Sequence, residues 1–353
     1  MNILKPFLAA AICTAALSFF AVGCSHPSQA PMYVIYDTDM GNDVDDAMAL
    51  DILYKYQDEG RIKLLAVMLN KVEYGAAEYV DLARTWYGYP ETRIGIIKEG
   101  ADCSHDAVNY AAAVADMTNE DGTPVYDRTC KDCSTLPLAV DLYREILSKV
   151  PDASVTIIST GFSSNLARLL DSQPDGYSKL TGKELVARKV KKLSIMAGAL
   201  TDSRTPEYNV IKDIPAAQKV ASEWPTELTT SPAEVGLAIL YPGSSIEQDF
   251  KWTDHHPMVD GFYIYRPMPY DACTFDVTSV LYAIEGAESA DGVPYFEVVG
   301  PGRLEFTDES FSRFTPDPEE TRYYLKVDSL MSANLVARFK ELVTRVPNSM
   351  QSK

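Results

Sequence analysis

The residues best suited to chemistry stand near the start of the chain. There an apolar run at residues 33–36 leads into five carboxylates: Asp37, Asp39, Asp43, Asp45 and Asp46. So many like charges in a short stretch repel one another unless a cation or a proton lies among the side chains. A strand ending in Asp-x-Asp, then a glycine turn and a helix beginning at an Asp-Asp pair, aims several carboxylates at one point. The pattern predicts a site for a hard cation at the carboxyl end of a first strand.

An acidic run also has an ordinary explanation, because solvated loops and helix caps use the same residues. That explanation suits one isolated aspartate. It suits Asp37, Asp39 and the Asp45-Asp46 pair poorly, since these directly follow a strand and precede an apolar helical stretch. For Asp43 alone we expect a plain loop residue.

The stretch 37–50 resembles the DxDxGxDDAxAL-like signature of the calcium-dependent, inosine-uridine preferring nucleoside hydrolases, with extra residues between Gly41 and the Asp-Asp pair. One motif would not suffice, because phosphatases of the haloacid dehalogenase type also begin with a strand and Asp-x-Asp. Four later segments follow in the family's order: Leu-Leu-Ala-Val-Met-Leu-Asn at 64–70, Thr-Gly-Phe-Ser-Ser-Asn-Leu-Ala at 160–167, Met-Ala-Gly at 196–198 with Glu-Tyr-Asn at 207–209, and Thr-Phe-Asp at 274–276. The resemblance covers about residues 32–347.

The resemblance implies a calcium site. Asp39 would be both a ligand and the general base that activates water. Asp46, Asp276 and the backbone carbonyl of Ser164 would complete the protein ligands, and Asp37 would lie behind them and fix their geometry. A calcium ion bound there would orient a water molecule and lower its pKa.

The resemblance also assigns Asp45, Asn70, Glu207 and Asn209 to the ribose hydroxyls. Carboxylate and amide groups suit a vicinal diol, and they reject a deoxy sugar because buried partners would be left unpaired. The implied substrate is a small ribonucleoside. The implied reaction is hydrolysis of its N-glycosidic bond to free base and ribose, through an oxocarbenium-like sugar.

Two departures from the family pattern concern the leaving base and the sugar. Inosine-uridine types carry a histidine before the last calcium aspartate to protonate the base, and this chain has Phe275 there. An aromatic ring can stack on a base, which makes Phe275 a substrate-binding candidate, but it cannot give the base a proton. Where many members use an asparagine for the 5′-hydroxyl, this chain has Thr201-Asp202.

The four histidines offer other proton donors. His255 and His256 lie about twenty residues before the last calcium aspartate, in a region where the family builds an active-site flap. The commoner role of such histidines is a structural or surface hydrogen bond. His105 stays undecided, and His26 falls in the predicted tether.

These residues need a scaffold that brings strand ends together. Strand-like runs alternate with helix-like stretches, at 34–36, 64–69, 93–97, 155–159 and 193–196. The alternation predicts one α/β domain with a mostly parallel open sheet, flanked by helices, and a site at the strand carboxyl ends. No repeat or linker interrupts it. We expect this domain at 32–347 and a C-terminal tail at 348–353.

The first residues are typical of export. Lys5 precedes an apolar run at 7–22, and Ala-Val-Gly-Cys at 21–24 resembles a bacterial lipobox. The pattern predicts a lipoprotein signal peptide at 1–23, lipidation of Cys24 and a tether at 24–31. An ordinary secretory signal or a short membrane anchor is the alternative. We therefore expect an exported, lipid-anchored protein in the bacterial periplasm or at the outer membrane or cell surface, touching the membrane only through its anchor.

Charge and cysteines set further bounds. The net charge of −18 argues against a nucleic-acid partner, because phosphate binding needs clustered Lys and Arg. Cys130-Lys-Asp-Cys133 is a CxxC pair without a second one, so we expect a local disulfide first, free thiols second and zinc last. The resemblance implies a homo-oligomer, because family members are often dimers or tetramers.

Three other functions stay open. The first is a hydrolase of the same fold that acts on a different N-ribosyl or glycosidic substrate. The second is a surface lipoprotein that captures nucleosides without cleaving them. The third is a magnesium-dependent phosphatase of the Asp-x-Asp kind, which the later segments disfavour.

Overall fold

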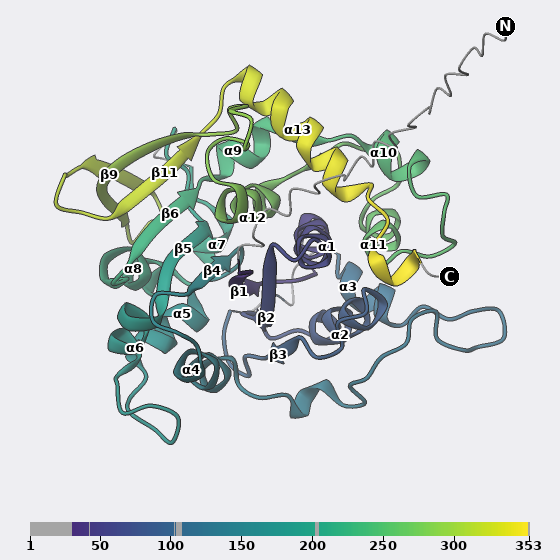
Figure 1. Ribbon diagram of the computed structural model, residues 1–353, viewed down its shortest axis with the longest axis horizontal. Coiled ribbons are helices and arrows are strands. Elements are labelled where there is room, and N and C mark those ends of the chain that lie inside the picture. Colours follow the sequence, from purple (N-terminus) through teal and green to yellow (C-terminus); the bar gives the residue numbers. More distant parts are fainter. Residues whose placement is uncertain (1–29, 42, 102, 104–107, 202–204, 352–353) are drawn as a thin grey trace, which may run out of the picture. The chain divides into compact units, whose positions relative to one another are not determined.

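The strand that leads into the carboxylates, β1 (Met32–Thr38), lies inside a nine-stranded sheet of order β10-β9-β11-β6-β5-β4-β1-β2-β3 (Figure 1). The computed structural model describes residues 30–41, 43–101, 103, 108–201 and 205–351. The predicted signal peptide, Cys24, His26, His105, Asp202 and most of the predicted tether lie outside the described residues. From Pro31 onward the chain forms one compact unit, and the predicted domain bounds within it stay a prediction.

The other strands of the sheet are β2 (Ile62–Leu69), β3 (Arg93–Gly95), β4 (Val155–Ser159), β5 (Val190–Met196), β6 (Glu227–Ser231), β9 (Glu297–Phe306), β10 (Ser312–Pro316) and β11 (Arg322–Lys326). A separate antiparallel pair is formed by β7 (Leu240–Tyr241) and β8 (Ala272–Cys273). The helices are α1 (Asp45–Asp58), α2 (Ala76–Trp86), α3 (Tyr110–Ala115), α4 (Ala139–Lys149), α5 (Ser164–Asp171), α6 (Gly182–Lys189), α7 (Tyr208–Lys212), α8 (Ile214–Glu223), α9 (Ala233–Ala238), α10 (Gly243–Gln248), α11 (Pro257–Tyr265), α12 (Phe275–Glu285) and α13 (Ser329–Val343).

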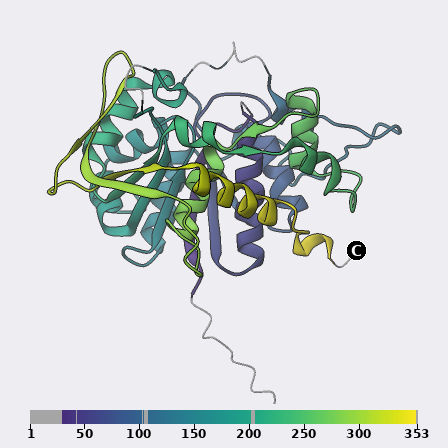
Figure 2. The same ribbon diagram turned by 90° about the horizontal axis from the view of Figure 1, so that it is seen from above.

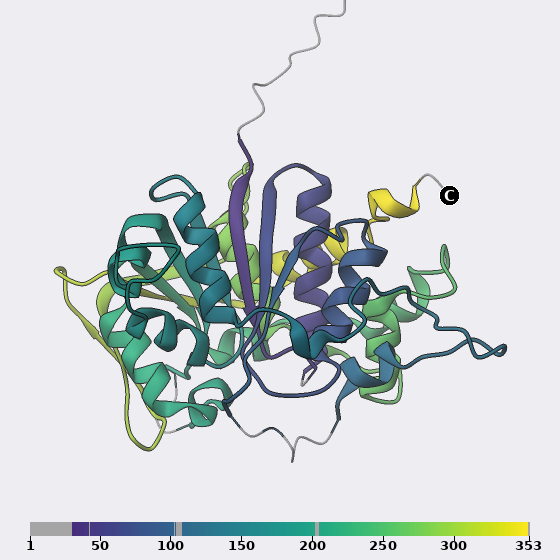
Figure 3. The same ribbon diagram turned by 90° about the horizontal axis from the view of Figure 1, so that it is seen from below.

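The strands from β3 across to β6 all pair in parallel, and β11 continues this direction beside β6. At the other edge, β9 pairs antiparallel with both of its neighbours, β11 and β10. The predicted mostly parallel open sheet flanked by helices is therefore confirmed. Figure 3 shows β1 and β2 side by side with α1 next to them.

Both faces of the sheet are covered, which explains why the central strands are mostly apolar on both faces rather than alternating. Val34 and Tyr36 of β1 join a core with α1, α2, α11, α12 and α13, whereas Ile35 joins a second core with α4, α5, α6 and α8. In Figure 2, α13 crosses beside α1, and Lys55 of α1 donates to the carbonyl of Val343 at the end of α13. The interior strands are buried toward their carboxyl ends, and polar side chains gather just beyond those ends.

The described cysteines are free thiols. Cys130 and Cys133 lie within hydrogen-bonding distance as free thiols, so the local disulfide we expected first is not formed and the second alternative holds. Within the part of the chain that the structure describes, no helix is long and apolar enough to cross a membrane.

Candidate active site

The carboxylates that follow β1 converge with one from a distant helix. After Asp39, Gly41 turns the chain with a φ of 114°, a conformation that glycine adopts most readily. Asp45 and Asp46 form the first turn of α1, where the helix dipole favours negative charge. Asp276 lies in the first turn of α12, and its backbone N–H donates to Oδ2 of Asp45 at 2.9 Å. Two helix N-termini and the end of β1 therefore meet.

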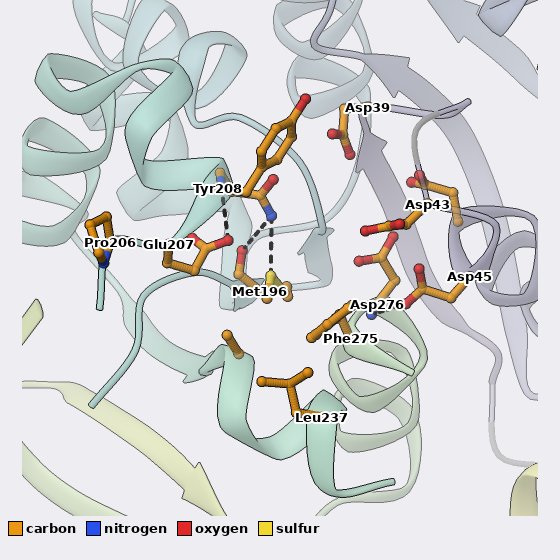
Figure 4. A pocket seen from close by; sticks show the side chains of 13 residues that line it. Asp39, Asp43, Asp45, Met196, Pro206, Glu207, Tyr208, Leu237, Phe275 and Asp276 are labelled. Carbon is orange, nitrogen blue, oxygen red and sulfur yellow. Dashed lines mark hydrogen bonds between the residues drawn. The ribbon is translucent and has the colours of Figure 1, made fainter. Parts of the chain in front are cut away.

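A cavity of about 180 Å³ lies at this meeting point (Figure 4). In the figure Asp39, Asp43 and Asp276 lie on one side of the cavity, with Glu207 and Tyr208 across from them. Seven of the predicted site residues line it: Asp39, Asp45, Asp46, Glu207, Asn209, Phe275 and Asp276. Six residues to which the sequence assigned no role line it too: Asp43, Met196, Pro206, Tyr208, Ala233 and Leu237.

Hydrogen bonds to the backbone hold the side chains of Glu207 and Asn209 in place. Glu207 precedes α7, and its carboxylate accepts hydrogen bonds from the backbone N–H groups of Asn209, Val210 and Gly198 at 2.9, 3.2 and 3.0 Å. The Asn209 amide donates to the carbonyls of Thr160 and Met196, at 3.2 Å each. Both side chains therefore have fixed positions before any ligand enters.

Asp37 and Asn70 are fully buried and do not line the cavity. Asp37 is fully buried and accepts hydrogen bonds from Asn70 at 2.6 Å, Tyr143 at 2.8 Å and Asn165 at 3.2 Å. The side-chain Oδ1 of Asn70 accepts from the backbone N–H of Phe162 at 3.1 Å. This placement agrees with a supporting role for Asp37. The predicted contact of Asn70 with a ribose hydroxyl stays a prediction, because its amide bonds within the protein here.

Two other predicted positions also lie away from the lining. Ser164 is buried at the start of α5, and its hydroxyl donates to Asp213. Thr201 is exposed, and its backbone N–H donates to Glu234 at 2.7 Å. The carbonyl role of Ser164 stays a prediction.

Burial and mutual repulsion make the cavity unfavourable for negative charge alone. Burial raises the pKa of Asp39 to about 7, with Asp43 adding to the rise and Lys71 opposing it. Burial, followed by the neighbouring carboxylates, raises the pKa values of Asp45 and Asp276 well above the usual range. The same two causes raise the pKa of Asp46. Burial also raises the pKa of Glu207 to about 7.

The donor set has the chemistry that a hard cation requires. Among the described residues, no three His, Cys, Asp or Glu side chains stand in an arrangement that could hold a metal ion as they are. Yet Asp39, Asp46 and Asp276 are all buried carboxylates at this meeting point, and a hydrogen bond joins the last two. Calcium takes oxygen ligands of this kind, and its charge would relieve their repulsion.

Neither histidine candidate lies at the cavity. His256 is buried among Trp86, Phe250 and Trp252, where burial lowers its pKa well below the usual value. His255 pairs through Nδ1 with Asp260 at 3.1 Å. Within the described residues, the structure therefore corrects the expectation that one of the two could serve as a leaving-group acid there.

Two charged residues near the site were missed. Asp43 accepts a hydrogen bond from Tyr265 and lines both this cavity and a second one of about 220 Å³. The sequence feature that could have indicated Asp43 is the lengthened segment between Gly41 and the Asp-Asp pair. Lys71 is buried, pairs with Glu73, and acts electrostatically on Asp39. Its signal was a lysine directly after the polar end of an apolar strand.

Comparison with known proteins agrees with this geometry. A family model described as inosine-uridine preferring nucleoside hydrolase matches residues 34–332. The chain belongs to this family. Nucleoside hydrolases are glycosylase-type hydrolases that act on N-glycosidic bonds, and this nucleoside hydrolase is accordingly an enzyme of that class. None of the curated proteins matches its sequence.

Solved structures share the fold of this nucleoside hydrolase. A purine-preferring ribonucleoside hydrolase from Gardnerella vaginalis is similar at 16% identity and a TM-score of 0.64, over 88% of this chain and 99% of that one. An inosine-uridine preferring nucleoside hydrolase from Bacillus anthracis is similar at 16% identity and a TM-score of 0.60, over 88% of this chain and 99% of that one. The type III effector protein XopQ, solved with adenosine diphosphate ribose, is similar at 15% identity and a TM-score of 0.60, over 90% of this chain and 94% of that one. At these identities the likeness shows the fold.

Proposed function

We propose that this nucleoside hydrolase cleaves the N-glycosidic bond of ribonucleosides and releases a free base and ribose. The observation that supports this most is the convergence of six carboxylates and Asn209 on one cavity, from chain segments far apart in sequence. The transition state of such a reaction carries positive charge on the sugar. Fixed carboxylates around the sugar stabilise that charge without having to reorganise.

The ribose would be held by Glu207, Asn209 and Asp45. Oε1 of Glu207 accepts one backbone N–H, from Asn209, and Oδ2 of Asp45 accepts one, from Asp276, so both carboxylates would keep lone pairs for the sugar hydroxyls. Because these groups are already fixed, binding would orient the ribose at little further cost in entropy. A 2′-deoxy sugar would leave buried acceptors without a donor and would be rejected.

We infer that calcium is held by Asp39, Asp46, Asp276 and the backbone carbonyl of Ser164. When bound, calcium would supply a polarised water molecule. Asp39 would accept a proton from the attacking water, since it directly follows β1 and lies across the cavity from Glu207. Lys71 would help to keep this carboxylate ionised between turnovers.

The test is release of free base from inosine, uridine, adenosine, guanosine and cytidine by the purified mature protein, with calcium and again with chelator. We expect release of at least one base, and loss of that release with chelator. Asp39→Ala should abolish it, whereas Asp291→Asn, which removes an exposed carboxylate, should not. Binding of nucleosides without turnover, unchanged in Asp39→Ala, would instead establish the capture function.

We further infer that the protein is an exported lipoprotein anchored through Cys24 in the periplasm or at the cell surface, and that it forms a homo-oligomer. The lipobox-like sequence at 21–24 supports the first inference. Incorporation of labelled fatty acid that is lost in Cys24→Ala tests the anchor. Light scattering of the soluble domain tests the oligomer, and a monomer across the micromolar range would contradict it.

A further inference from the structure

Phe275 marks the part of the cavity that the family resemblance assigns to the leaving base. This ring stands where the family resemblance places a proton-donating histidine. Its position is fixed by α9, because a Cβ on Gly236 would lie only 2.5 Å from Cδ1 of Phe275. The side chain is half-buried and lines both the carboxylate cavity and the second cavity of about 220 Å³. The two cavities therefore meet at an aromatic surface.

Three further aromatic rings line these cavities, those of Tyr208, Tyr265 and Tyr270, and two of them already contact a cation of the chain. The Nζ of Lys212 lies 5.0 Å from the ring centroid of Tyr208, which lines the first cavity. The guanidinium of Arg266 lies 4.7 Å from the ring of Tyr265, which lines the second. Electron-rich ring faces attract positive charge, most strongly where water is partly excluded.

The charges around the cavities have the same preference. Six carboxylates line the first cavity, and among its described lining residues there is no Lys, Arg or His. The second cavity has Asp43, Asp45 and Asp271 against Arg266. A calcium ion would offset only two of the negative charges. The field at Phe275 therefore favours a positively charged ring over a neutral or anionic one.

The charge of the departing base decides whether the reaction needs a proton donor. When a neutral nucleoside loses its base, the electron pair of the broken C1′–N bond makes the base an anion unless it is protonated. When the base is a ring cation joined through nitrogen, the same electron pair neutralises it, and no proton donor is needed. Water oxygen bonds to C1′, Asp39 takes one water proton and passes it to solvent, and one proton is released for each turnover.

We propose that the preferred substrates are ribosides whose base carries a positive charge, of the N-ribosylpyridinium type. This rests on the proposed N-ribohydrolase function and names the substrate class of the same site. Asp43 strengthens the preference, because it adds a carboxylate at the junction of the two cavities, between Asp45 and Tyr265.

The experiment compares kcat/KM for nicotinamide riboside with kcat/KM for uridine and inosine, on calcium-loaded mature protein. We expect a ratio above roughly 100 in favour of the cationic riboside, about the size of a general-acid contribution that only the neutral substrates require. Phe275→His should lower this ratio at least about tenfold by restoring a proton donor for neutral bases. Asp43→Asn should lower it about fivefold, because one unit charge is removed at an exposed site. Asp291→Asn, a matched control on the surface, should leave it unchanged.

The outcomes separate the two proposals. Efficient hydrolysis of uridine or inosine, with a ratio near or below one and unaltered in Asp43→Asn, would overturn the cationic preference and leave the N-ribohydrolase function intact. No base release from any of the three ribosides would overturn the proposed function itself. Because Asp43 is exposed, Asp43→Asn should fold even if Phe275→His does not.

Discussion

Helix α1 carries two buried charged regions that differ in their partners. At its N-terminus, Asp45 and Asp46 face other carboxylates, and burial together with like charge raises their pKa values. Two turns further along, Asp51 accepts from Lys55 at 2.9 Å and from Tyr87, and Lys55 also donates to a backbone carbonyl of α13. The second region satisfies its charges within the fold, so it stabilises the scaffold. The first does not, and it is suited to a cation and a reaction.

Neutralising the first region should have the largest effect on activity. Asp39→Asn removes the proposed general base and should lower kcat/KM by about 10³-fold, within the range for loss of a positioned acid or base. Its melting temperature should not fall, because the substitution relieves like-charge repulsion at a buried site. Base release and thermal unfolding of the same samples measure the two effects. A variant with full activity would contradict the role of Asp39.

Breaking the second region should affect stability instead. Both side chains of the Asp51–Lys55 pair are fully buried. Lys55→Met leaves a buried carboxylate without its cation and should lower the free energy of unfolding by about 3–5 kcal/mol. Lys149→Met is the matched control, since Lys149 is 67% exposed in a pair of the same i,i+4 spacing with Glu145. Its effect should stay below about 1 kcal/mol.

Urea unfolding at neutral pH measures both lysine variants. Activity for each folded molecule should be retained in Lys55→Met, since the site carboxylates are unchanged. Equal stability of the two variants would contradict the distinction between the regions.

Added calcium sharpens the comparison further. At a concentration one hundred times its dissociation constant, a cation that binds only the folded state stabilises by about 2.7 kcal/mol. We expect the melting temperature of the wild type and of Lys55→Met to rise with calcium. Asp46→Asn and Asp276→Asn should lose most of this rise. A rise that is the same in all four proteins would place calcium elsewhere.

The smallest expected effect concerns pH. Burial raises the pKa of Glu207 to about 7 in the folded state, from a usual value of 4.5. A carboxyl group whose pKa is raised by folding contributes its full stability at pH values below its pKa in the unfolded chain. This contribution is lost as the pH rises through the folded pKa of about 7. In chelator, the wild type should therefore lose a few degrees of melting temperature between pH 5 and pH 8 that Glu207→Gln does not lose. The exposed Glu120→Gln should behave like the wild type.

The sequence predicted the parts of this site that local pattern controls. The apolar run, the glycine turn and the Asp-Asp pair gave β1 and the first turn of α1, because each is a property of neighbouring residues. Asp276 lies 231 positions from Asp45, and only the family resemblance brought the two together. No periodicity could show that Asp43 meets Tyr265, 222 positions away, or that His256 is buried among aromatic rings. Such contacts depend on tertiary packing between distant segments.

One measurement tests the central claim most directly: base release from a panel of neutral and cationic ribosides by the wild-type protein, titrated from chelator to saturating calcium. We expect release that rises from zero with calcium, reaches a plateau and is lowered about 10³-fold in Asp39→Asn at every calcium concentration. Base release that is undiminished in chelator, or equal in Asp39→Asn, would contradict it. The crowded carboxylates of the cavity would then be neither the cation site nor the source of the reaction.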